Sequence, residues 1–105
     1  MASREVIWTK TAAKQRRLIL EYWVEKTGNS DFSLMLLYEA KDRVEQLISH
    51  PLAGQKTDYP DTRALSLGHY SIFYKIHKNN IVITAFWDNR QDPKKLIKEL
   101  QSNKE

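Results

Sequence analysis

The chain has 105 residues, of which 41% are hydrophobic and 10% aromatic, a composition typical of one folded domain and not of a disordered segment. It contains no cysteine, which excludes a disulfide framework and thiolate chemistry and fits a reducing compartment. The formal net charge of +4 favours an acidic partner, either nucleic acid or an acidic protein segment, although solubility alone accounts for such a charge in many small domains.

We expect a single domain over residues 1–105. No apolar run reaches the length of a signal-peptide core or of a membrane span. The expectation is therefore a cytoplasmic protein with no membrane partner.

The N-terminal part of the chain predicts a short strand and a helix. Residues 6–8 are short and apolar, as in a strand. Thr9 or Thr11 can cap a helix over about residues 12–27 by accepting from a free backbone N–H. That helix is expected to end at Gly28, the residue type that most readily takes up the left-handed cap conformation.

A second helix is predicted directly after the first. Residues 29–31 offer polar caps, and apolar positions continue at helical spacing as far as Ser49. The step from His50 to Pro51 ends the helix, because the residue before proline avoids helical dihedral angles. Two helices joined by so short a turn form a helical hairpin.

The second half of the chain predicts strands. Residues 52–62 read as a loop, after which residues 63–67 and 70–77 alternate in the two-residue period of a strand. Asn79-Asn80 tolerates positive φ and so favours a tight turn. Residues 81–87 are apolar on both faces, as in a central covered strand.

Asp92-Pro93 then starts a final helix with Leu96, Ile97 and Leu100 on one stripe. The predicted order is β-α-α-β-β-β-α. The fold class is α+β, with an N-terminal helix hairpin packed on one face of a small antiparallel sheet. The opposite face is expected to be partly open and to carry the function.

The C-terminal third carries an ordered set of motifs. They are Arg63, Gly68-His69-Tyr70, Ile72-Phe73-Tyr74, Trp87-Asp88-Asn89-Arg90 and Asp92-Pro93. Together with the element order, this set resembles the RelE/ParE family of bacterial toxins, and the resemblance covers nearly the whole chain.

Members of that family have two activities. RelE-like toxins cut messenger RNA in the ribosomal decoding site, whereas ParE-like toxins inhibit DNA gyrase. Both are neutralised by an antitoxin encoded beside them, which wraps the toxin as an extended helix or strand. The resemblance implies the growth-inhibiting toxin of a type II toxin–antitoxin module of the plasmid-stabilisation kind, held by a cognate antitoxin in a hetero-oligomer.

The residues at the family's catalytic positions distinguish its RelE-like and ParE-like branches. The resemblance implies an arginine after the glycine-tyrosine turn, a proton-transferring residue in the last helix and a cation at the strand end; these positions hold Ser71, Leu96 and Arg90. Serine supplies no fixed cation, and leucine transfers no proton. The Asp92-Pro93 pair after Arg90 matches the ParE-like branch, which implies a non-enzymatic inhibitor that binds DNA gyrase.

Two alternatives stay open. A ribosome-dependent messenger RNA endoribonuclease with an altered catalytic set would hold phosphate with Arg63 and Arg90 and move protons with His69 or Lys75. A degenerate family member would be harmless and would only bind an antitoxin.

Candidate contact residues follow from these interpretations. For gyrase, they are Trp87, Arg90, Lys94, Lys95 and Lys98. For the antitoxin, they are the apolar residues Met35, Leu36 and Tyr38 of the second helix, or the sheet edge, to which a strand can be added. Three scattered histidines and no cysteine give no metal-ligand spacing, so we expect no metal and no cofactor.

Overall fold

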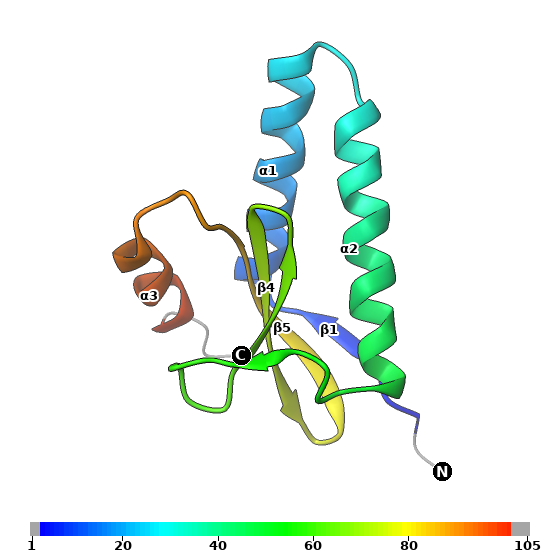
Figure 1. Cartoon of the computed structure of the whole chain (residues 1–105), viewed down its shortest axis with the longest axis vertical. Coiled ribbons are helices and arrows are strands. Elements are labelled where there is room, and N and C mark those ends of the chain that lie inside the picture. The colour runs from blue at the N-terminus through cyan, green and yellow to red at the C-terminus, as the bar shows by residue number, and fades with distance from the viewer. Residues whose placement is uncertain (1–2, 102–105) are drawn as a thin grey trace.

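The computed structural model describes residues 3–101, which form a helical hairpin, one sheet and a C-terminal helix (Figure 1). In chain order the elements are β1 (Val6–Trp8), α1 (Lys10–Thr27), α2 (Asp31–Ser49), β2 (Gln55–Lys56), β3 (Arg63–Leu67), β4 (Tyr70–His77), β5 (Asn80–Asp88) and α3 (Pro93–Gln101). Within this part of the chain, no helix combines the length and apolar composition needed to cross a bilayer.

The five strands lie in the order β1-β5-β4-β3-β2. β5 pairs with β4, β4 with β3, and β3 with β2, all antiparallel. β1 instead runs parallel to β5, from Val6 opposite Ile81 to Trp8 opposite Ile83. The α+β class is confirmed, but the sheet is mixed and not wholly antiparallel. The sequence prediction also missed β2, whose two residues are too short for a periodic signal.

The predicted cap at Thr9 and the predicted helix ends at Gly28 and His50 are confirmed, although α1 begins at Lys10 and not at about residue 12. The Thr9 hydroxyl accepts a hydrogen bond from the Ala12 N–H at 3.2 Å, and Gly28 ends α1 with φ of 78°. At the start of α2, the side-chain oxygen of Asn29 accepts from the Asp31 N–H at 3.0 Å. These local contacts fix where the two helices begin and end, and so set the length of the hairpin.

The hairpin and α3 cover opposite faces of the sheet and create two cores. The larger core lies between the hairpin and the sheet, and its fully buried side chains include Leu47, Ile72, Tyr74, Ile83 and Phe86. The smaller core contains Phe73, Ala85, Trp87 and Leu96. The face expected to be partly open is therefore covered at one end by α3.

β1 pairs with β5 only as far as Ile83, because the chain turns into α1 at Thr9, whose N–H donates to the Ile83 carbonyl at 3.1 Å. Beyond that point a side chain replaces the missing strand: the Gln15 side-chain oxygen accepts from the Phe86 N–H at 2.8 Å. A buried backbone donor left unpaired would cost free energy, so Gln15 stabilises the free edge of β5 beneath α1.

The β4–β5 turn differs by one residue from the prediction. His77 pairs with Asn80, so the two left-handed residues are Lys78 and Asn79, with φ of 50° and 69°. Arg4 holds this turn by donating to the carbonyl and the side-chain oxygen of Asn79 at 2.9 and 2.7 Å. The segment before β1 is therefore attached to the far end of the central hairpin.

Tyr74 fixes the loop that leaves α2. Its hydroxyl accepts from the Gly54 N–H at 2.9 Å and donates to the Pro51 carbonyl at 2.8 Å. Desolvation by burial raises the pKa of Tyr74, so the hydroxyl stays protonated and can act as donor and acceptor at once. A Cβ at Gly54 would lie 2.6 Å from the Tyr74 ring, so this close approach requires glycine.

We expect Tyr74→Phe to lower the free energy of unfolding by about 1–3 kcal/mol, because it leaves the Gly54 N–H buried without its acceptor. Urea unfolding measures this change. Tyr38→Phe is the matched control, since Tyr38 is 65% exposed and should be neutral. Equal unfolding midpoints for Tyr74→Phe and the wild type would contradict this role for the hydroxyl.

Candidate functional site

Arg90 lies just beyond the end of β5 and is held by Asp88. Its Nε and one terminal nitrogen donate to the two carboxylate oxygens of Asp88, each at 2.9 Å, and its backbone N–H donates to the same carboxylate. The side-chain hydrogen bond from Arg90 is the main reason that the pKa of Asp88 lies below its ordinary value. The guanidinium also lies 5.9 Å from the centroid of the Tyr70 ring.

A cleft of about 540 Å³ joins Arg90 to α1. Residues that line it include Leu18, Tyr22, Trp23, Lys26, Tyr70 and Arg90. Leu18 and Tyr22 are half exposed, at 50% and 52%, and the Trp23 indole N–H donates to the Tyr70 hydroxyl at 2.6 Å. The cleft therefore combines exposed apolar area with a cation of fixed orientation, which suits the binding of a protein partner.

The five predicted target-binding residues lie in three different places in the structure. Arg90 lines the cleft beside α1, whereas Lys94, Lys95 and Lys98 are exposed on α3. Trp87 is only 7% exposed and belongs to the core beneath α3, so the expectation that it contacts a partner is corrected. Leu18 and Tyr22 were missed, although their four-residue spacing and apolar character were visible in the sequence.

The four residues of the alternative nuclease set separate into two pairs. His69 lies at the Arg90 end, where its carbonyl accepts from the Asn89 N–H at 2.8 Å. Arg63 and Lys75 lie at the other end of β4, where both line a second pocket. From Tyr70 to Lys75 the strand rises by roughly 17 Å, at about 3.3 Å per residue. No single phosphate can reach both pairs.

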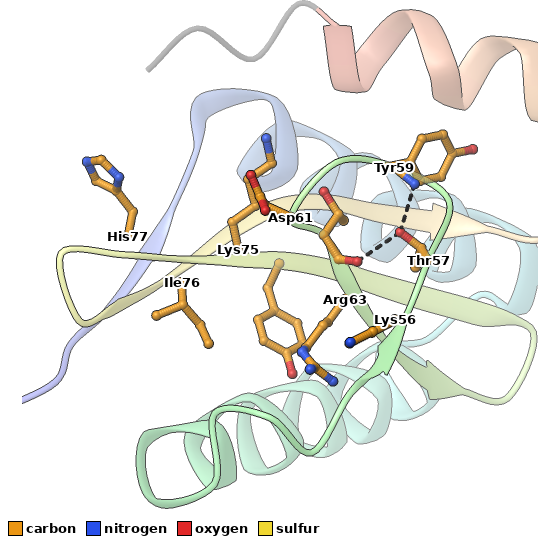
Figure 2. Close-up of a pocket in the computed structure, with 10 residues that line it drawn as sticks. Lys56, Thr57, Tyr59, Asp61, Arg63, Lys75, Ile76 and His77 are labelled. Carbon is orange, nitrogen blue, oxygen red and sulfur yellow. Dashed lines mark hydrogen bonds between the residues drawn. The ribbon is translucent and has the colours of Figure 1, made fainter.

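The second pocket has a volume of about 650 Å³ and adjoins the part of β4 that extends beyond β3 (Figure 2). Asp61, with φ of 54°, lies in the loop between β2 and β3, next to the point where β3 starts opposite Tyr74. In Figure 2, Lys75 and His77 lie on one side of the β4 ribbon, and Arg63 on the other. Alternation across the strand keeps these cations from converging on one point.

Arg63 has a structural role in this pocket. Its guanidinium donates to the carbonyls of Gly54 at 2.7 Å and Leu52 at 3.2 Å. Two positions where the RelE-like pattern implies catalytic residues also hold side chains with structural contacts. The Ser71 hydroxyl donates to the Asn89 side chain at 3.0 Å, and Leu96 is 5% exposed in the core beneath α3.

The predicted antitoxin-binding residues also lie on two different faces of α2. Met35 and Tyr38 are exposed, at 53% and 65%, as expected. Leu36 is 4% exposed and belongs to the larger core, which corrects its assignment to the exposed face. Leu36, Ala40 and Val44 are four residues apart and define the stripe that faces the core.

Among residues 3–101, no group of three or more His, Cys, Asp or Glu residues could hold a metal ion.

Comparison with known proteins agrees with this description. The fold is similar to that of a solved chain described as "Chromosomal ParDE TA system from P. aeruginosa", with a TM-score of 0.70 and 22% sequence identity, over 80% of this chain and 94% of that one. At this identity the similarity shows the fold. A search of curated proteins found no match.

The fold is of the RelE/ParE type, with Arg90 just beyond the end of its central strand. The family model described as "ParE toxin of type II toxin-antitoxin system, parDE" matches residues 6–93. The chain therefore belongs to the ParE toxin family and is the toxin component of a type II toxin–antitoxin system, with an antitoxin as partner.

We expect Arg90→Gln to raise the pKa of Asp88 toward the ordinary value for an aspartate, because the side-chain hydrogen bond that lowers it is lost. In the wild type the folded pKa is the lower one. The stabilisation of the folded state by the Asp88–Arg90 contact is therefore complete above the pKa of Asp88 in the unfolded chain. It is lost as the pH falls through the pKa of Asp88 in the folded protein. Carboxyl-carbon NMR titration measures the shift.

Arg17→Gln is the control for this titration, because its ion pair with Glu21, at 3.6 Å, is exposed and distant in sequence from Asp88. An unchanged Asp88 pKa in Arg90→Gln would show that the guanidinium does not hold the carboxylate in solution.

Proposed function

We propose that this toxin inhibits DNA gyrase by binding it, acts in the bacterial cytoplasm and is neutralised by a cognate antitoxin. One observation carries the proposal: the positions where an RNA-cleaving toxin would hold catalytic residues are occupied here by side chains that make structural contacts. Leu96 packs in a core, and Ser71 pairs with Asn89. Family membership supports a toxin, and these two residues favour the branch that acts without cleaving RNA.

Geometry disfavours the endoribonuclease alternative. Cleavage at a ribose 2′-hydroxyl needs a base, an acid and a cation within reach of one phosphate. His69 lies near Arg90 at one end of β4, and Lys75 lies near Arg63 at the other. One terminal nitrogen of Arg63 also donates to two backbone carbonyls, which gives this side chain a structural role.

The cleft between α1 and the end of β5 is the best candidate for the gyrase contact. Arg90 is held in one orientation by Asp88, so it loses little side-chain entropy on binding a carboxylate or carbonyl of a partner. Leu18 and Tyr22 add exposed apolar area on the same cleft. The lysines of α3 would contribute to long-range attraction more than to contact energy.

The purified toxin should inhibit supercoiling by gyrase, and Arg90→Glu should reduce this inhibition by about tenfold or more, since it reverses the charge in the cleft. Lys56→Glu makes the same charge change at the second pocket and should inhibit as the wild type does. A supercoiling assay with relaxed plasmid measures both.

Unimpaired supercoiling, together with messages cut within codons on ribosomes, would reject the proposal and establish the nuclease alternative. Harmless overexpression with intact antitoxin binding would instead establish the third alternative, a member that only binds its antitoxin.

A further inference from the structure

A third pocket lies on the α3 side of the sheet. Its volume is about 380 Å³, within the range of about 300–1,000 Å³ that small-molecule sites usually have. β4 and β5 contribute its floor, and its walls come from α3 and from the loop between β2 and β3. It is therefore a concave site of ligand size, built from segments far apart in the sequence.

An irregularity in β5 shapes the floor of this pocket. Phe73 of β4 is paired with Ala85 of β5. The next pair is Tyr74 with Ile83, so Thr84 is an extra residue of β5 between them, as in a β-bulge. Ala85 belongs to the smaller core, whereas Thr84 lines the pocket. Bulges are common next to active sites, where they re-aim a side chain, and this one directs a hydroxyl-bearing residue to the pocket.

The lining combines apolar side chains with a few buried hydroxyls. Thr9, Thr62 and Thr84 all line the pocket, and each is less than 5% exposed. The apolar part of the lining is larger and consists of Tyr59, Pro60, Val82, Ile97 and Leu100. A mostly apolar wall with a small number of fixed polar groups is the usual composition of a small-molecule site.

Two basic side chains stand on one strand at this pocket. Lys75 and His77 line it and are two residues apart on β4, so they share a face of the sheet. Figure 2 shows both pointing toward the side of β4 on which α3 lies, drawn in pale red at the top. Within residues 3–101 neither of them forms an ion pair, and Asp61 lines the second pocket but not this one. Both can therefore donate hydrogen bonds to an anion.

We propose that this pocket binds a small molecule that has an apolar body and one carboxylate. The apolar lining holds the body, and the Lys75 ammonium and the His77 imidazole bind the carboxylate. Two residues along a strand span roughly 7 Å, so both side chains can reach one carboxylate. A single ammonium balances a single negative charge, which favours a monocarboxylate over a phosphate.

This site is separate from the proposed contact with gyrase. The residues that line it and those that line the Arg90 cleft are different sets, so the inference does not depend on the target of the toxin. Ile97 comes from α3 and Val82 from β5, and one apolar body therefore contacts both elements. A ligand that binds only the folded chain stabilises it by mass action, and its binding is expected to raise the thermal midpoint.

The test titrates the purified full chain with cinnamate, and with cinnamyl alcohol as its uncharged counterpart, by isothermal titration calorimetry. Cinnamate should bind saturably at one site and raise the thermal midpoint, and the alcohol should bind about tenfold more weakly, because it lacks the charge-assisted hydrogen bonds. Backbone amide NMR shifts should change around Val82, Thr84 and Ile97. No saturable binding of cinnamate at millimolar concentration, or equal affinity for the two probes, would overturn the inference.

Lys75→Gln should weaken cinnamate binding by about tenfold and leave the binding of cinnamyl alcohol unchanged. Lys98→Gln is the matched control, because it removes the same charge from an exposed position of α3 outside the pocket and should bind cinnamate as the wild type does. Both lysines are exposed, so circular dichroism should show an unchanged fold. Equal losses of cinnamate affinity in the two variants would indicate a general effect of net charge and reject the site.

Ile97→Asp probes the apolar part of the pocket. It places a carboxylate in the lining and should weaken the binding of both probes, since Ile97 is 40% exposed and its replacement leaves the core intact. Unchanged affinity of Ile97→Asp for both probes would place their binding elsewhere on the protein and overturn the inference.

Discussion

The structure depends on β5, a central strand of the sheet that contributes side chains to both cores. β5 lies between β1 and β4, and its residues Ile81, Ile83, Ala85, Phe86 and Trp87 are all buried. The first two and Phe86 face the hairpin, whereas Ala85 and Trp87 face α3. α1 follows β1, which pairs with one edge of β5, and α3 follows β5 itself. The same strand therefore positions both α1 and α3.

α1 presents different side chains on two of its sides. Leu18 and Tyr22 line the Arg90 cleft, and Lys14 and Arg17 line a shallow hollow on another side of the helix. The apolar residues that accompany Arg90 are therefore separated from the basic residues of the same helix.

Local sequence patterns predicted most of the fold. The features that were missed depend on contacts between residues far apart in the sequence. Thr9, Gly28 and the His50-Pro51 step set helix ends through contacts with near neighbours, so the sequence contains them directly. The parallel pairing of β1 with β5 joins residues some 75 positions apart, as does the contact of Arg4 with Asn79, and no local pattern encodes either. In the candidate site, Arg90 was predicted from its motif. The burial of Trp87 and Leu36 depends on α3 and on the exact stripe of α2 that meets the sheet.

There is a simple physical reason why one fold of this class can exist with or without a catalytic residue in its last helix. A proton-transferring residue in the last helix must stay solvated and near a cation, which limits how firmly that helix can pack on the sheet. Leu96 removes this limit and packs with Trp87 and Phe73 in a continuous apolar contact. A toxin that acts by binding can therefore use this face of the sheet for stability and leave recognition to Arg90 and α1. The same backbone then supports a different activity through a few side chains.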